Sequence, residues 1–364
     1  MTQPKSFRTY HQRKRMPARP LQPVIDPADW SPESLGDVES WSYRLTEKSD
    51  CTELIAATHA IRRNAIAPED VNRSNFALQG LADTLREVRR ELLDGRGMVM
   101  LQGFPVDALD PLGRAIAYLG VGSYLGRPMS QNMQGHILGH VKDLGGDYSH
   151  PTTRGYLTRA ELRFHADGCD YVWLLCINPP MSGGASRVAS SVRVYNRMLE
   201  TRPDLVAVLA QDFYRSRKGD YNPGEDPWYR QPMFCFTDGW FSATGAGSAI
   251  DKAQGLPGVP PLTPEQQEAI AAYRQTVDEC AADIPFKPGD VQFLNNYVTL
   301  HSRRSYEDWP DGQRKRHLLR LWLADPDGRR PIPEAQQEGY EGSGVLPVGV
   351  KLNAPLDVSE LAAA

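Results

Sequence analysis

Cysteine is scarce in this 364-residue chain, and its pattern excludes two kinds of stabilised fold. The five cysteines are odd in number and contain no Cys-x-x-Cys pair, which argues against a disulfide framework and against a zinc ribbon. Unpaired cysteines are typical of a reducing compartment, so we expect a cytoplasmic protein. The residues concerned are Cys51, Cys169, Cys176, Cys235 and Cys280.

Long apolar runs and an excess of one charge are also missing. No segment approaches the roughly 20 apolar residues of a membrane span, and residues 1–20 contain no apolar core of a secretory signal. The formal net charge of -4 gives no field for binding nucleic acid or a membrane surface. We therefore expect neither partner, and the sequence leaves the oligomeric state open.

One local excess of charge exists at the N-terminus. It is a basic arm made of Lys5, Arg8, Arg13, Lys14, Arg15 and Arg19. We interpret this arm as a solvated tail or a strap along the domain. A nucleic-acid arm is the alternative, but no aromatic stacking pattern follows it.

A glycine fingerprint after a strand is absent, as is regular alternation of strands and helices, so a doubly wound parallel sheet is not expected. An apolar stripe instead predicts a helix over residues 75–95. It consists of Leu78, Leu81, Leu85, Val88 and Leu92. A buried strand is expected at 98–101 and a second helix at 112–119.

Strand patterns dominate the second half of the chain. Apolar runs predict strands within 162–177, 186–189, 291–294 and 317–325. Helices are expected after Ser190, after Pro203, and after Thr263, which opens a capping box. Short strands with helices before and between them indicate an α+β protein built on a β-sandwich or jelly roll. We expect an N-terminal extension at 1–70, a jelly-roll domain at 71–330 and a C-terminal wrap or tail at 331–364.

A possible metal site begins in the segment Arg163-Phe164-His165-Ala166-Asp167-Gly168. On a strand, side chains at i and i+2 share a face, so His165 and Asp167 would point the same way. His301, which we expect where a later strand ends, is the candidate third ligand. Two histidines and one carboxylate form the set that binds non-haem Fe(II). Each residue alone is weak support, because a single His is more often structural than a ligand.

Two arginines strengthen this interpretation. Period two places Arg316 and Arg320 on one face of the strand at 317–325, and both faces are largely apolar. A buried guanidinium needs an anionic partner, which a dicarboxylate cosubstrate would supply. The alternative is an ordinary ion pair with Asp290, Glu307 or Asp311.

Four motifs in this order resemble the taurine dioxygenase/TfdA-like Fe(II)/2-oxoglutarate-dependent dioxygenases. They are Phe164-His165-Ala166-Asp167, Gly183-Gly184-Ala185-Ser186, Pro288-Gly289-Asp290 with Asn296 and His301, and Arg316-x3-Arg320. The resemblance covers about residues 95–325. It implies a double-stranded β-helix (the clavaminate synthase-like jelly roll) with flanking helices.

The resemblance also implies roles for six residues. His165, Asp167 and His301 would bind Fe(II), Arg316 would hold the distal carboxylate of 2-oxoglutarate, and Ser186 would hydrogen-bond the same cosubstrate. Ser186 as an ordinary strand serine is the equal alternative. Arg320 would face an anionic group of the substrate or the cosubstrate. Because Asp167 is a carboxylate, halogenation is not expected.

The implied activity consumes 2-oxoglutarate and O2, releases succinate and CO2, and hydroxylates or desaturates a C–H bond of a small organic molecule. Alternatives are a non-catalytic jelly roll that binds metal and 2-oxoglutarate, a zinc hydrolase, and an oxygenase with a protein or nucleic-acid substrate. The sequence offers several pocket residues, each more often found in a core. They are Tyr171, Trp173, Tyr297, Trp240 and Phe241, with Gln131 and Asn132 as polar candidates.

Overall fold

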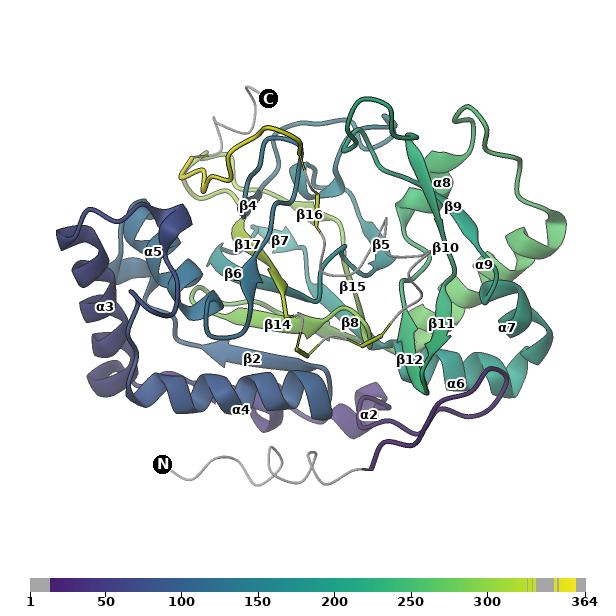
Figure 1. Ribbon diagram of the computed structural model, residues 1–364, viewed down its shortest axis with the longest axis horizontal. Coiled ribbons are helices and arrows are strands. Elements are labelled where there is room, and N and C mark those ends of the chain that lie inside the picture. The colour runs from purple at the N-terminus through teal and green to yellow at the C-terminus, as the bar shows by residue number, and fades with distance from the viewer. Residues whose placement is uncertain (1–13, 326, 329, 332–343, 346, 358–364) are drawn as a thin grey trace.

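Two facing β-sheets form the centre of the protein (Figure 1). The computed structural model describes residues 14–325, 327–328, 330–331, 344–345 and 347–357. The larger sheet has the order β1-β2-β14-β6-β17-β3, and β4 also pairs with β17. Its strands are β1 (Ser42–Arg44), β2 (Met98–Gln102), β14 (Val291–Asn295), β6 (Tyr171–Asn178), β17 (His317–Ala324), β3 (Arg127–Pro128) and β4 (Leu138–Val141).

The smaller sheet has the order β13-β8-β15-β5. Its strands are β13 (Ala281–Ile284), β8 (Ser186–Ser190), β15 (Thr299–Arg303) and β5 (Leu162–His165). A layer of apolar side chains, including Met100 and Val172 from the larger sheet and Val188 from the smaller one, fills the space between the sheets. Apart from β1 with β2, the strand pairs that the structure describes are antiparallel. The jelly-roll prediction is confirmed.

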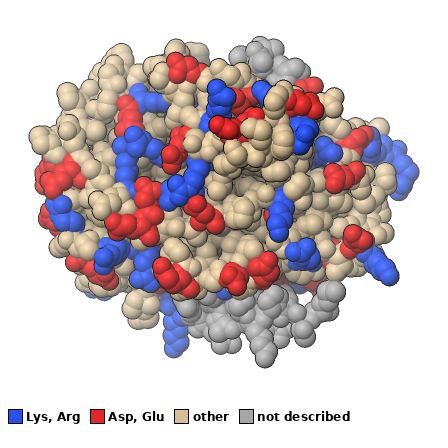
Figure 2. Space-filling model, turned by 180° about the vertical axis from the view of Figure 1, so that it is seen from behind, with Lys and Arg blue, Asp and Glu red and all other residues tan. Residues whose placement is uncertain are grey.

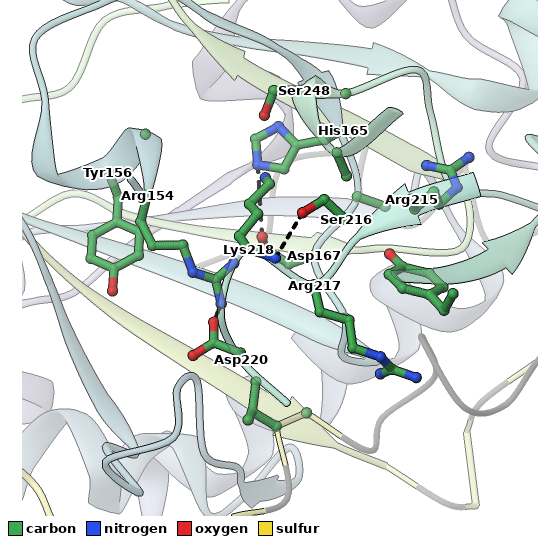
Figure 3. A pocket seen from close by; sticks show the side chains of 18 of the residues that line it. Arg154, Tyr156, His165, Asp167, Arg215, Ser216, Arg217, Lys218, Asp220 and Ser248 are labelled. Carbon is green, nitrogen blue, oxygen red and sulfur yellow. Dashed lines mark hydrogen bonds and ion pairs between the residues drawn. The ribbon is translucent and has the colours of Figure 1, made fainter. Parts of the chain in front are cut away.

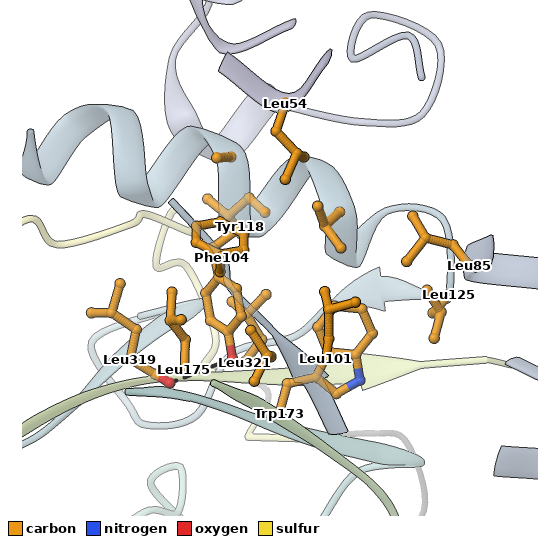
Figure 4. Packing of buried hydrophobic residues seen from close by; sticks show 14 of the residues in the cluster. Leu54, Leu85, Leu101, Phe104, Tyr118, Leu125, Trp173, Leu175, Leu319 and Leu321 are labelled. Carbon is orange, nitrogen blue, oxygen red and sulfur yellow. Dashed lines mark hydrogen bonds between the residues drawn. The ribbon is translucent and has the colours of Figure 1, made fainter. Parts of the chain in front are cut away.

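Three helices cover the outer face of the larger sheet: α3 (Thr52–Arg63), α4 (Gly80–Asp94) and α5 (Pro111–Gly122). Figure 4 shows Leu85, Tyr118 and Trp173 in the core between these helices and the strands. The predicted helix at 75–95 begins later, at Gly80. Its first backbone N–H groups bond to the carboxylate of Glu53 on α3, a cap that lies far away in the sequence.

A second group of helices lies beyond the smaller sheet: α6 (Ser191–Thr201), α7 (Pro203–Leu209) and α9 (Pro264–Glu279). The Ser190 side chain caps α6, and Thr263 opens the predicted capping box of α9. Two hairpins connect this layer to the sheets, β9 (Phe213–Ser216) with β10 (Trp228–Gln231) and β11 (Phe234–Thr237) with β12 (Trp240–Ala243). The remaining α-helices and strands are α2 (Pro32–Leu35), α8 (Ser248–Ala253), β7 (Ser182–Gly183) and β16 (Tyr306–Glu307).

The described part of the basic arm lies against the body of the protein. Arg15 forms an ion pair with Asp26 at 2.9 Å and donates to the Leu93 carbonyl. This contact favours the strap interpretation for Arg15, whereas Lys5, Arg8 and Arg13 lie outside the described residues. The domain boundaries at 70 and 330 stay a prediction.

The distribution of charged side chains on the surface agrees with the low net charge. Figure 2 shows acidic and basic side chains interspersed over the face that it presents. Within the described ranges, no helix combines the length and the apolar character that crossing a bilayer would require.

Candidate active site

The His-x-Asp motif lies at the end of β5, and only its histidine belongs to the strand. His165 is the last residue of β5, and Asp167 follows in the loop. The expectation that both sit on one strand was therefore wrong. The loop is held by Asn296, whose side chain accepts from the Asp167 N–H at 3.1 Å and donates to the Cys169 carbonyl at 2.9 Å. Asn296, which the sequence marked only as part of the third motif, fixes the direction of Asp167.

His301 lies in the middle of β15, which corrects the prediction that it follows the end of a strand. The chain turns at Asn295, whose side chain accepts from the Tyr297 N–H, and enters a new strand at Thr299. The register then places His301 directly opposite His165, with ring centroids 4.3 Å apart. Strand pairing thus brings together two histidines that are distant in the sequence.

The three side chains converge on one point. One potential ligand atom from each of His165, Asp167 and His301 lies within 4.8 Å of the others. The Nε2 atoms of His165 and His301 are each 3.7 Å from an Asp167 oxygen. The His165 Nδ1–H donates to the Arg163 carbonyl at 2.9 Å, which leaves Nε2 with its lone pair toward the centre. Two imidazoles and one carboxylate in this arrangement fit a divalent iron.

The surroundings of His165, Asp167 and His301 favour the protonation states that bind a cation. Burial raises the pKa of Asp167, but Arg320 and the two histidines outweigh it and hold that pKa well below its ordinary value. Burial lowers the pKa of His301 to about 3, and burial also lowers the pKa of His165. The imidazoles are therefore neutral and the carboxylate charged at neutral pH. The Trp322 indole N–H donates to Asp167 Oδ2 at 2.9 Å.

Arg320 lies beside the triad on the inner face of β17. Its Nη1 is 3.5 Å from Asp167 Oδ2, and its Nε donates to Gln131 Oε1 at 2.7 Å. Its guanidinium also stacks 4.6 Å from the Tyr156 ring. Gln131, considered as a substrate contact, holds this arginine in place.

The guanidinium of Arg316 is buried and forms no ion pair with a carboxylate among the described residues. Its side chain lies over the Tyr306 ring at 5.1 Å, and its Nη1 has no hydrogen-bond acceptor. Among the described residues, no carboxylate forms an ion pair with Arg316, so the alternative pairing with Asp290, Glu307 or Asp311 is not found. Burial lowers the pKa of Arg316, and Tyr306 and Asp308 offset this only in part.

A second buried guanidinium, unexpected from the sequence, accompanies Arg316. Arg303 donates through Nη2 to the Thr158 carbonyl at 2.8 Å, while its Nε and Nη1 have no acceptor. Burial, followed by the charge of Arg316, lowers the pKa of Arg303 to about 10. In the sequence, Arg303 was marked only by its position two residues after His301.

Ser186 is buried at the start of β8, directly opposite Arg303 in the strand register. Its hydroxyl donates to Gln292 Oε1 at 3.1 Å, and the Gln292 Nε2 has no acceptor. Ser186, Arg303 and Gln292 therefore lie together. This position suits a cosubstrate contact as well as it suits a structural serine.

A cavity of about 490 Å³ opens next to the triad (Figure 3). His165, Asp167 and Arg320 lie on its wall, whereas Arg316 does not. Most of the other lining residues were not predicted from the sequence, because they lie in loops and short elements without a periodic pattern. They include Arg154, Tyr156, Lys218, Asp220 and Tyr229.

The aromatic residues considered for a pocket are placed elsewhere. Tyr171, Trp173, Tyr297 and Phe241 are fully buried in the cores. Trp240 lies under Arg15, away from the cavity.

The comparison with known families decides the class of protein. The family described as "Taurine catabolism dioxygenase TauD, TfdA family" matches residues 61–322, well over half of the chain. The chain belongs to the TauD/TfdA family. It is therefore an Fe(II)- and 2-oxoglutarate-dependent dioxygenase, an oxidoreductase that uses Fe(II), 2-oxoglutarate and O2, and the non-catalytic alternative is not favoured.

Individual relatives agree with the TauD/TfdA assignment. The chain is 29% identical over 323 residues to FR-33289 synthase of Streptomyces rubellomurinus, covering 85% of this chain and 92% of that protein. It is 28% identical to a taurine hydroxylase-like protein of Stachybotrys chartarum, covering 83% and 80%.

Solved structures show the same fold. An asparagine oxygenase in complex with Fe(II), hydroxyasparagine and succinate superposes with a TM-score of 0.62 at 19% identity, covering 78% of this chain and 93% of that chain. The non-heme iron oxygenase OrfP in complex with Fe and alpha-ketoglutaric acid gives 0.58 at 17% identity, covering 82% and 99%.

Proposed function

We propose that this TauD/TfdA dioxygenase hydroxylates or desaturates an unactivated C–H bond of a small organic molecule at a centre formed by His165, Asp167 and His301. The convergence of two Nε2 atoms and one carboxylate within 4.8 Å is the observation that supports this most strongly. When bound, Fe(II) supplies the O2 chemistry that couples decarboxylation of 2-oxoglutarate to oxidation of the substrate. A cytoplasmic location accords with five free, buried cysteines.

The protein's own residues contribute position and charge. The Arg163 carbonyl and the Asn296 side chain orient His165 and Asp167 respectively. Trp322 stabilises the charged form of Asp167 through its indole N–H. These contacts hold the ligand atoms in place before any metal arrives, which favours one geometry of binding.

Arg316 is the proposed partner of the distal carboxylate of 2-oxoglutarate. Its buried charge lacks an acidic partner among the described residues, and a carboxylate would remove the free-energy cost of that burial. Arg303 lies close enough to add a second positive charge, and Ser186 adds a hydroxyl nearby. A zinc hydrolase would give no role to these buried arginines.

The reaction can be tested by measuring succinate formed from 2-oxoglutarate. We expect succinate only when Fe(II) and O2 are both present, and we expect its loss in His301→Ala and Asp167→Ala. Lys287→Met, on an exposed turn, is the matched control and should keep the wild-type rate. Succinate formation that persists in both ligand variants would contradict the proposed centre.

A further inference from the structure

A segment near the C-terminus forms part of the cavity wall beside the triad. Gly344 and Val345 both line this cavity. The Gly344 N–H donates to the Gly168 carbonyl at 3.1 Å, directly after the ligand candidate Asp167. The Val345 N–H donates to the Ser130 carbonyl at 3.0 Å. The segment therefore bridges two loops of the cavity, the one that carries Asp167 and the one that follows β3.

Residues 347–352 continue along the surface at the mouth of the cavity. The Val348 N–H donates to Asn222 Oδ1 at 3.0 Å, and Asn222 lines the cavity. Tyr221, the neighbouring lining residue, is 38% exposed, so the cavity reaches the surface at this loop. Residues 344–345 and 347–352, which we call the flap, thus lie at the edge of the opening.

Few buried contacts hold the flap in place. Val348 is 81% exposed and Val350 is 41% exposed, so these apolar side chains bury little surface. Gly344 and Gly349 have φ of 60° and 76°, values that glycine adopts without the steric cost of a Cβ. A segment with few buried apolar contacts opens locally at a small cost in free energy.

The residues that follow the flap are fixed beside β4 (yellow in Figure 1). The Asn353 N–H donates to the Gly135 carbonyl at 3.0 Å, and the Pro355 carbonyl accepts from His140 Nε2 at 2.9 Å. Since a carbonyl can only accept, His140 carries its proton on Nε2, and its Nδ1 accepts from His317 Nε2–H at 2.8 Å. The flap therefore has one fixed end.

We propose that this flap is a gate for the substrate. Residues 344–345 and 347–352 move away from Ser130 and Asn222 to admit it and then return to close the cavity, while residues 353–357 stay on β4. The inference rests on the proposed function, because the molecule admitted is the one that the triad oxidises. A flap held by a few hydrogen bonds suits this role, because a segment that covers an active site must open in every catalytic cycle.

Two substitutions loosen the flap without replacing a residue of the triad. Gly344→Ala places a Cβ 2.6 Å from the Ser130 carbonyl oxygen and forces the flap away from that wall. Asn222→Ala removes the acceptor for the Val348 N–H. Gly255→Ala is the matched control, because Gly255 has φ of 92° and its new Cβ would meet no atom within 4 Å.

Opening of the flap is measured by trypsin cleavage after Lys351, whose side chain is 84% exposed. Cleavage requires local opening, so its rate reports the population of the open state. Each loosening substitution weakens a hydrogen bond of the flap, which corresponds to a rate increase of about tenfold. The free energy of unfolding in urea should stay nearly unchanged, and Gly255→Ala should be cleaved like wild type. Cleavage at the wild-type rate in both loosened variants would overturn the proposal.

Entry into the cavity is measured with a cysteine on its wall. Ser216 is buried and lines the cavity (Figure 3), and the five native cysteines are buried. In Ser216→Cys protein, we compare modification by the small reagent methyl methanethiosulfonate with modification by the bulky reagent fluorescein maleimide. We expect each loosening substitution to accelerate the bulky reagent by the same factor as the cleavage, and to leave the rate of the small reagent unchanged.

Faster cleavage after Lys351 with unchanged labelling of Ser216→Cys by fluorescein maleimide would overturn the proposal. The flap would then cover the surface without controlling entry, a purely structural role. Neither measurement requires Fe(II) or 2-oxoglutarate. A failure of the proposed iron centre would therefore leave the test of the gate intact, and a failure of the gate would leave the iron centre standing.

Discussion

Replacing Arg316 by methionine should separate stability from cosubstrate binding. Arg316 is only 2% exposed, and its Nη1 has no acceptor. Methionine fills a similar volume with apolar atoms and removes a buried charge that has no acidic partner among the described residues. The substitution should therefore leave the ligand-free protein as stable as wild type or more stable, although a contact with the Tyr306 ring is lost.

The expected loss of affinity is large. Breaking a buried pair between a guanidinium and a carboxylate costs about 3–5 kcal/mol, which corresponds to a factor of roughly 100 to 5,000 in the dissociation constant of 2-oxoglutarate. The contact with Tyr306 contributes about 1 kcal/mol to the stability of the ligand-free protein. The expected loss of 2-oxoglutarate affinity is thus several times larger than the loss of stability from the Tyr306 contact.

Arg96→Met is the matched control. Arg96 is equally buried, but its guanidinium donates to Glu91 at 2.8 Å, and both side chains are almost fully buried. Its removal leaves a buried carboxylate without this partner and should destabilise the protein by about 3–5 kcal/mol. Urea unfolding of the ligand-free proteins and calorimetric titration with 2-oxoglutarate give the two quantities. Strong destabilisation by Arg316→Met with unchanged 2-oxoglutarate affinity would refute the reasoning, because Arg316 would then be a structural residue.

Three further changes have defined outcomes. Trp322→Phe removes the N–H that bonds to Asp167 and should weaken Fe(II) binding by about 10–100-fold in an anaerobic titration; unchanged affinity would contradict its role. Gly247→Ala places a Cβ 2.9 Å from the Cβ of His165, so Fe(II) affinity should fall while the free energy of unfolding in urea changes little. Unchanged Fe(II) affinity would contradict this, because it would show that β5 shifts to accommodate the new Cβ without displacing His165. Burial lowers the pKa of His317 to about 3 in the folded protein, so its contribution to stability is present above about pH 6.5 and is lost as the pH falls toward 3. Urea unfolding at pH 7 and pH 5 should show a smaller loss for His317→Gln than for wild type, and equal losses would contradict this.

The strands and the metal-ligand candidates were predictable because their signals are local. The apolar run of β17 identified a central strand, and Arg320 lies on it as predicted, whereas Arg316 directly precedes it. The spacing of His165 and Asp167 marked them as candidates, and the other motifs supported the interpretation as metal ligands. The reason given for their convergence was wrong, because Asp167 lies in a loop whose direction is set by Asn296.

Other features depend on partners that are far away in the sequence. The start of α4 is set by Glu53, and the position of His301 follows from pairing with β5 and β8. The cavity wall comes from the loops that carry Arg154 and Lys218, where no periodic pattern marks a buried face. The sequence near those loops mixes basic and acidic residues with prolines and glycines, so the charge of the cavity could not be predicted.

The central claim is that His165, Asp167 and His301 hold Fe(II) beside a 2-oxoglutarate bound by Arg316. A crystal structure grown anaerobically with Fe(II) and 2-oxoglutarate tests it most directly. We predict iron bonded to both Nε2 atoms and to Asp167, with the distal carboxylate of 2-oxoglutarate on the Arg316 guanidinium. Iron bound at other residues, or a distal carboxylate turned toward Lys218, would contradict the account.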